Sequence, residues 1–234
     1  MTEQQRCAWH PNELTGVSCQ RCGRHICPNC QIIAAVGFQC PECAKDKQAV
    51  KTLYSYKQPR FTQIIIAICV AAFVFSFGNT NQTFFDYGLN PVFVLEYGEY
   101  WRLITSMFLH ANFMHIAFNM LALWQVGFAL ENRIGKYRFA VIFFLTGIGG
   151  GLLSAYMNEP FAFSVGASGA VFGLFGAWIA INRRLNFDSS GLVAMIAINL
   201  GLGFVVPGID WHGHLGGLLT GLVLGNIVEL RKRR

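Results

Sequence analysis

The chain has 234 residues, of which 53% are hydrophobic and only 13% are charged, and its mean hydropathy is +0.41. Soluble domains carry about a quarter charged residues, so this chain has too few polar residues to face water on all sides. Its net charge of +6 raises the question of nucleic-acid binding, which the placement of the basic residues answers.

The first part of the chain is rich in cysteine. Seven of the eight cysteines and one histidine form four pairs, each with two residues between its members. These eight residues are Cys7, His10, Cys19, Cys22, Cys27, Cys30, Cys40 and Cys43. They are enough for two tetrahedral zinc ions, because each pair can hold one side of an ion from a tight turn. We therefore expect a zinc-binding module at residues 1–45, with two structural ions and no cofactor for catalysis.

A disulfide framework is the alternative explanation for these cysteines. It requires an oxidising compartment, whereas the orientation derived below places this segment in the cytoplasm, where thiols stay reduced. The polar, cysteine-rich residues 1–30 also differ from a cleaved signal peptide. A basic linker is expected to follow at residues 46–60, and the first apolar segment is expected to be an uncleaved anchor.

Long apolar runs dominate the rest of the chain and are nearly free of charge. They cover residues 61–77, 110–130, 139–157, 165–181, 192–206 and 214–228. At about 1.5 Å per residue, helices of roughly 15 to 21 residues cover most or all of a hydrocarbon core about 30 Å thick. Buried helices of a soluble protein explain one such run but not six. We expect an all-α membrane protein with a six-transmembrane-helix bundle over residues 61–230.

The basic residues indicate the orientation of these spans. If six spans alternate, 17 of the 18 Lys and Arg residues fall on one side, and Arg102 alone lies opposite. The positive-inside rule places the first side in the cytoplasm, together with both termini and a basic tail at residues 231–234. Attraction to anionic headgroups of the lipid bilayer explains this charge, so no nucleic-acid partner is expected.

Polar groups inside the spans are the candidate functional residues, because they are costly in hydrocarbon. All 12 Asp and Glu residues lie outside the spans or at their ends, which excludes a two-aspartate intramembrane protease and argues against a proton-coupled transporter. The sequence His-Glu-x-x-His does not occur, which removes the common metalloprotease arrangement. Histidine, asparagine and serine remain.

The second and fourth spans each contribute candidates. His115 and Asn119 are four residues apart and share a helix face, with His110 at the outer boundary of the same span. Hydrogen bonding between helices without any chemistry is the alternative for this group. Ser168 opens the fourth span. A serine there is most often a helix cap, but free amide groups at a helix start also suit a developing oxyanion.

Glycines are spaced so that the fourth and last spans can pack closely. Gly166 and Gly169 flank the serine and allow other backbone to approach, and His214 of the last span is followed at helical spacing by Gly217 and Gly221. Matched stripes of small residues let two helices pack closely, which would bring the His214 imidazole to the serine hydroxyl near the outer surface. An imidazole is the usual base that activates a serine. With no acid inside the spans, the pair would be a dyad.

These motifs together resemble those of the rhomboid intramembrane proteases. The motifs are Trp101-Arg102, His110-x4-His115-x3-Asn119, Gly166-Ala-Ser168-Gly169 and His214-x2-Gly217-x3-Gly221. The resemblance covers about residues 61–230. It implies that Ser168 is the nucleophile and His214 the general base, and that His115, Asn119 and the Ser168 amide form the oxyanion hole. Trp101 and Arg102 would belong to the first outer loop.

Two positions depart from the family pattern. Phe172 stands where many members carry a tyrosine beneath the catalytic histidine, so ring stacking is retained and a hydroxyl contact is lost. Gly213 stands where an alanine commonly precedes His214.

The cysteine spacing resembles that of B-box zinc fingers, in which alternate pairs share a metal ion. The resemblance would assign one ion to Cys7, His10, Cys27 and Cys30, and the other to Cys19, Cys22, Cys40 and Cys43. Sequential pairing remains the alternative.

The expected function is cleavage of transmembrane segments of membrane protein substrates by a multi-pass protein of the bacterial plasma membrane. The zinc module would bind a cytoplasmic protein partner or regulate access. One alternative is a catalytically silent rhomboid-like protein that binds membrane proteins. Another is a channel or transporter, although the chain lacks a charged site at mid-membrane.

Overall fold

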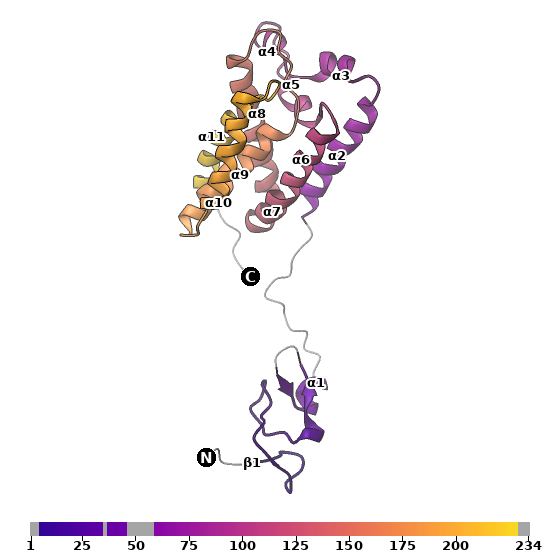
Figure 1. The fold of residues 1–234 in the computed structure, drawn as a ribbon, viewed down its shortest axis with the longest axis vertical. Coiled ribbons are helices and arrows are strands. Elements are labelled where there is room, and N and C mark those ends of the chain that lie inside the picture. The colour runs from indigo at the N-terminus through magenta and orange to yellow at the C-terminus, as the bar shows by residue number, and fades with distance from the viewer. Residues whose placement is uncertain (1–4, 35–36, 46–58, 229–234) are drawn as a thin grey trace. The chain divides into compact units, whose positions relative to one another are not determined.

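The computed structural model describes residues 5–34, 37–45 and 59–228. The chain divides into two compact units, Met1–Tyr56 and Lys57–Arg234 (Figure 1). Most of the expected linker at residues 46–60, and all of the tail at residues 231–234, lie outside the described residues. Each unit has a core of its own, rich in cysteine in the first and built from apolar helix faces in the second.

The first unit contains two small hairpins and two short helical segments. Strand β1 (Gln5–Arg6) pairs with β2 (Leu14–Thr15), and β3 (Ile32–Ile33) pairs with β4 (Phe38–Gln39), both antiparallel. The 3-10 helix η1 (Pro28–Cys30) and the helix α1 (Pro41–Lys45) both begin at a proline, whose fixed φ suits a first helical position.

The buried core of this unit is unusually small. Among the described residues, it consists of Ile26 and five cysteine side chains, those of Cys7, Cys19, Cys27, Cys30 and Cys40. So little apolar surface cannot offset the conformational entropy of some 40 ordered residues. A unit of this size usually needs a further source of stability, such as bound metal ions.

The second unit is built from helices, and every apolar run predicted from the sequence lies on one of them. The long helices are α2 (Arg60–Ser76), α6 (Phe113–Ala122) continued by the π-helical turn η3 (Leu123–Gly127) and by α7 (Phe128–Ile134), α8 (Lys136–Met157), α9 (Ser168–Arg184), α10 (Ser190–Val205) and α11 (Trp211–Ile227). Among the described helices, Phe113–Ile134 and Lys136–Met157 are long and apolar enough to cross a membrane, while α2 and α10 are apolar but shorter.

A loop of short helices joins α2 to α6 at one end of this unit (Figure 1). It contains α3 (Thr80–Tyr87), α4 (Pro91–Leu95), α5 (Arg102–Thr105) and the 3-10 helix η2 (Ser106–Phe108). Arg102 is buried in this loop. Its guanidinium donates hydrogen bonds to the Glu99 carboxylate at 2.5 Å and to the carbonyls of Phe85 and Gly88, each at 2.9 Å. Arg102 therefore holds the loop together from within.

The start of α2 is fixed by a buried carboxylate. Glu131 on α7 accepts hydrogen bonds from the backbone N–H groups of Phe61 and Thr62, at 3.1 and 2.8 Å, and from the Thr62 hydroxyl at 2.8 Å. The first N–H groups of a helix have no partner within it, and a negative charge there also suits the helix dipole. Glu131 therefore joins α2 to α7 at the end of the helices opposite to the loop.

Helices α8, α9 and α11 pack side by side, and α9 and α11 touch through their glycines (Figure 1). A Cβ atom at Gly217 would overlap the carbonyl oxygen of Gly169, and one at Gly221 would overlap that of Gly173. The expected stripes of small residues on these two helices do face each other. Because the two backbones are in contact, α11 has a fixed position along the axis of α9.

Replacing Gly221 by alanine is expected to lower the free energy of unfolding by about 2–4 kcal/mol, because the added methyl group must push two helix backbones apart. Thermal unfolding in detergent measures this loss. Gly201→Ala on α10 is the matched control, since a Cβ at Gly201 meets nothing within 4 Å, and we expect it to keep or slightly raise stability. Equal stability of the two variants would contradict the close packing of α9 on α11.

Candidate active site and metal centre

Ser168 is the first residue of α9, and its hydroxyl is not used as a helix cap. Ala167 occupies the cap position, and the helix start has no side-chain cap hydrogen bond. Just before it, Gly166 has a φ of +127°, a value that side chains disfavour, and its N–H donates to the Ser106 carbonyl at 2.9 Å. This turn leaves the Ser168 hydroxyl available for other contacts.

Ser168 and His214 line the same cavity, which lies where α9 and α11 begin. Ser154, Ser164 and Asp210 line it as well. Among the described residues, no hydrogen bond joins the Ser168 hydroxyl to the imidazole, and Nδ1 of His214 is buried without a hydrogen-bond partner. Such bonds are often long in unliganded enzymes and shorten when substrate binds. The structure thus brings the two groups to one cavity without a hydrogen bond between them.

The His214 ring is oriented by stacking. Its centroid lies 4.3 Å from that of Phe172, with 6° between the ring planes, so phenylalanine supplies the aromatic surface expected beneath the histidine. The structure also explains why a glycine, and not an alanine, precedes the histidine. A Cβ atom at Gly213 would lie 2.8 Å from Oδ2 of Asp210, so the carboxylate occupies the space of an alanine methyl group.

The two expected oxyanion-hole side chains differ in placement. The His115 ring lies against Gly166, where a Cβ atom would be 2.8 Å from Nε2 of His115 and 3.6 Å from Oγ of Ser168. His115 and Ser168 therefore approach the same glycine. Asn119, in contrast, donates its side-chain amide to the carbonyl of His115 at 2.9 Å, one turn back in its own helix. His110 is buried, and its ring meets that of His115 edge to face at 5.2 Å.

Trp101 and Arg102 lie outside the lining of this cavity. The Arg102 guanidinium lies 4.6 Å from the Trp101 ring centroid, and the Trp101 ring meets that of Tyr87 at 6.2 Å. Both residues therefore make these contacts within the outer loop and not in the cavity. His212 lies in the first turn of α11, with Nδ1 2.5 Å from Oδ1 of Asn158.

Asp210 is the residue of the cavity that sequence reasoning missed. It is the N-cap of α11, and its carboxylate accepts hydrogen bonds from Ser154, Asn158 and the N–H of Gly213. Burial raises the pKa of the Asp210 carboxyl, but these hydrogen bonds outweigh burial, so the pKa is lowered from its ordinary value. The group is therefore charged at neutral pH. An aspartate directly before an apolar helix is a typical cap, and this signal could have found it.

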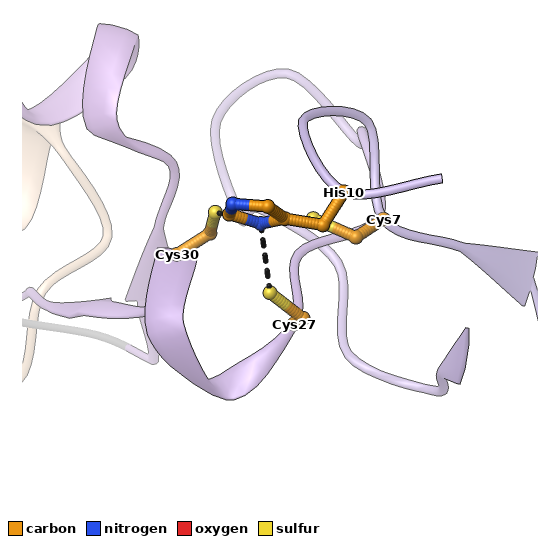
Figure 2. Close-up of side chains that lie close together, drawn as sticks. All are labelled: Cys7, His10, Cys27 and Cys30. Atoms are coloured by element: carbon orange, nitrogen blue, oxygen red, sulfur yellow. Dashed lines mark hydrogen bonds between the residues drawn. The ribbon is translucent and has the colours of Figure 1, made fainter. Parts of the chain in front are cut away.

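The first unit gathers its cysteines and His10 into two groups of four. Figure 2 shows the first group, formed by Cys7, His10, Cys27 and Cys30. Nδ1 of His10 lies 3.8, 3.3 and 3.3 Å from the sulfurs of Cys7, Cys27 and Cys30. The second group is formed by Cys19, Cys22, Cys40 and Cys43, with the sulfurs of Cys22 and Cys40 3.8 Å apart. In both groups the members come from alternate pairs along the chain.

The two groups fit zinc. With bonds of about 2.0–2.3 Å, the ligand atoms of a tetrahedral zinc ion lie roughly 3.3–3.8 Å apart, as these do. Arg24 supports the second group, because its Nε donates to Sγ of Cys22 at 3.4 Å and thereby lowers the pKa of that thiol. A lower pKa favours the thiolate, which is the form that binds metal. Four protein ligands per group suit a structural ion.

Comparison with known proteins places the helical unit in a family. The model of the rhomboid domain matches residues 97–231. Over 197 residues, 80% of this chain and 38% of the relative, the chain is 36% identical to "Rhomboid protease GluP" of Bacillus subtilis (strain 168). Over 143 residues, 58% of this chain and 71% of the relative, it is 36% identical to "Putative rhomboid protease YdcA" of the same organism.

Plant proteins are similar as well. The chain is 40% identical to "RHOMBOID-like protein 6, mitochondrial" of Arabidopsis thaliana over 145 residues, 59% of this chain and 47% of the relative. The chain thus spans less than half the length of GluP and of this plant protein. The rhomboid domain nevertheless covers more than half of the chain, and the matched residues lie in the helical unit and include Ser168 and His214 of the cavity. The chain belongs to the rhomboid family.

Proposed function

We propose that this chain is an intramembrane serine endopeptidase that cleaves transmembrane segments of membrane proteins, with Ser168 as nucleophile and His214 as general base. One observation carries the proposal: a serine and a histidine from two different helices line one cavity, at the ends where both helices begin. The relatives GluP and YdcA, whose names describe rhomboid proteases, support it.

The geometry suggests how each step proceeds. His214 takes the proton of the Ser168 hydroxyl as the oxygen attacks a carbonyl of the unwound substrate, which forms a tetrahedral intermediate. The proton then passes from His214 to the leaving amine, and the peptide bond breaks to give an acyl-enzyme. A water molecule, deprotonated by the same imidazole, releases the second product and restores the serine.

The negative oxygen of the intermediate needs hydrogen-bond donors. The start of α9 offers the Ser168 amide and the positive end of a helix dipole, and His115 lies beside Gly166 within reach of the same region. Asn119 can take part only if its amide leaves the carbonyl of His115. We therefore assign the principal role in the oxyanion hole to His115 and the Ser168 amide, with Asn119 recruited when substrate binds.

The proposed setting is the plasma membrane of a bacterium. Six spans over residues 61–230 cross it, so that both termini, including the basic residues 231–234, are cytoplasmic. The starts of α9 and α11, and with them the cavity, then lie near the outer surface. A basic linker at residues 46–60 joins the bundle to a B-box-like module at residues 1–45, which holds two structural zinc ions.

The module is proposed to bind a cytoplasmic protein partner. Ile32 and Ile33 on β3 and Phe38 on β4 are exposed, and Ile33 is 84% accessible. Exposed apolar side chains that lie close together are typical of a protein contact.

The experiment that tests the proposed activity is incubation of the purified protein with a membrane-anchored substrate in liposomes, followed by mass spectrometry of the product termini. We expect new termini within or next to the transmembrane segment of the substrate. The alternative, a rhomboid-like binder without activity, predicts that the substrate copurifies with the protein and remains intact.

A further inference from the structure

The Asp210 carboxylate joins three parts of the helical unit around the cavity. Its Oδ2 accepts from the Ser154 hydroxyl on α8 at 2.5 Å, and its Oδ1 accepts from the Asn158 amide, just after α8, at 3.0 Å. Ser164, in the segment that leads to the nucleophile, lies 3.1 Å from the Ser154 hydroxyl and 3.3 Å from the Asn158 amide. Asp210 itself caps α11 through Gly213.

This network extends to the outer loop. Ser164 and Leu89 exchange two backbone hydrogen bonds, of 2.9 and 3.1 Å. The carboxylate is therefore the point where the outer loop, the end of α8, the segment before Ser168 and the start of α11 are connected. Ser154, one of its donors, is 1% exposed. A buried network of this kind is rigid when all its members are paired.

This network fixes the position of His214. It follows Asp210 by four residues, and its backbone N–H donates to the Asp210 carbonyl at 3.2 Å, so the two lie one helical turn apart. The carbonyl oxygen of Gly213 packs against Gly150 of α8. A Cβ atom added at Gly150 would lie 2.6 Å from this oxygen. The first turn of α11 thus has little room to shift without moving the imidazole relative to Ser168.

The charge of Asp210 matters as well as its geometry. An imidazole that takes a proton from serine becomes a cation, and a fixed carboxylate nearby in a site poor in water stabilises that cation. Among the described residues that line the cavity, Asp210 is the only acidic one. None of the described hydrogen bonds joins its carboxylate to the His214 ring, so it acts through the helix and through its field.

We propose that Asp210 is a positioning residue for the Ser168–His214 pair: it fixes the first turn of α11 against α8 and keeps a negative charge one helical turn from the imidazole. This inference rests on the proposed protease function, which it extends from two side chains to a third.

The test is Asp210→Asn, which keeps the shape of the side chain and one acceptor oxygen but removes the charge. The number of active sites is titrated with a fluorophosphonate, and kcat and KM for a transmembrane substrate are measured per titrated site. We expect kcat per site to fall roughly 10- to 100-fold, with KM within about twofold of the wild-type value. A merely structural role would reduce the number of titratable sites and leave kcat per site unchanged, and that result would overturn the proposal.

Asp188→Asn is the matched control. Asp188 lies two residues before α10 and accepts hydrogen bonds from the N–H and the hydroxyl of Ser190, at 3.0 and 2.8 Å, but it is not among the residues that line the cavity. We expect its kcat per site to stay within about twofold of the wild-type value. A loss as large as that of Asp210→Asn would show a general effect of aspartates near helix starts and reject the specific role.

Ser154→Ala keeps the test decisive if Asp210→Asn does not fold. It removes one donor to the carboxylate and retains the charge, so kcat per site should fall roughly 3- to 10-fold. An unchanged value would contradict the positioning role. A wild-type protein that neither cleaves nor reacts with the fluorophosphonate, while Asp188→Asn behaves identically, would instead reject the proposed function itself and the role of Asp210 with it.

Discussion

Replacing Ser168 by alanine is expected to reduce kcat for cleavage of a transmembrane substrate by at least about 10³-fold while the protein stays folded. No neighbouring hydroxyl is well placed to take over. Ser154 and Ser164 line the same cavity, but both hydroxyls are engaged in the hydrogen-bond network around Asp210. The Ser168 hydroxyl makes no capping bond, so its loss should change thermal stability little. Cleavage rates in liposomes and the midpoint of thermal unfolding measure both effects.

Ser76→Ala is the matched control for this substitution. Ser76 is likewise a serine of the helical unit, but it lies at the end of α2, donates to the carbonyl of Phe73 and does not line the cavity. We expect the control to cleave at a rate close to that of the wild type. Cleavage by Ser168→Ala at more than about a tenth of the wild-type rate would contradict the assignment of the nucleophile.

Removal of zinc is expected to unfold the first unit and to leave the helical unit folded. The described core of the first unit contains one isoleucine besides its cysteines. Structural zinc ions contribute about 10–16 kcal/mol each to the folding of such modules, far more than this core can. We expect two zinc ions per purified chain. After treatment with a chelator, proteolysis within residues 5–45 should accelerate strongly, while the thermal midpoint of the helical unit stays unchanged.

Two cysteine substitutions separate metal binding from general thiol chemistry. Cys27→Ser should lower the zinc content from two ions to one, because Cys27 belongs to the first group of four. Cys69→Ser should keep both ions, since Cys69 is a buried residue of α2 outside either group. Unchanged resistance to proteolysis after complete loss of metal would contradict a structural role for zinc.

Periodicity and spacing allowed much of this structure to be predicted. The apolar runs gave the long helices within a few residues, because burial or lipid contact requires such runs whatever the tertiary contacts are. The glycine spacing on α9 and α11 gave their close contact, as Gly217 against Gly169 shows. The cysteine pairs gave two groups of four ligand atoms. Spacing alone left sequential pairing open, and the structure groups the alternate pairs that the resemblance to B-box zinc fingers implied.

The rest depends on contacts between residues far apart in the sequence. The Asp210 carboxylate accepts hydrogen bonds from Ser154 and Asn158, which are more than 50 positions away in the sequence. No local sequence pattern predicts such partners. Arg102 was expected in the outer loop as the one basic residue on that side, and only the fold of the loop shows that it is buried beside Glu99. Asn119 shares a helix face with His115 as expected, yet its amide bonds to the helix backbone, because a side-chain rotation decides between the two partners.

The central claim is that the Ser168 hydroxyl and the His214 imidazole act together on a substrate. Covalent labelling tests it without knowledge of the substrate, because a fluorophosphonate reacts with a serine only when a base activates its hydroxyl. The measurement is the rate of labelling, with the modified peptide identified by mass spectrometry, in the wild type and in His214→Ala. We predict modification at Ser168 that slows at least about 100-fold without the imidazole. Equal rates in the two proteins, or modification of a different serine, would contradict the account.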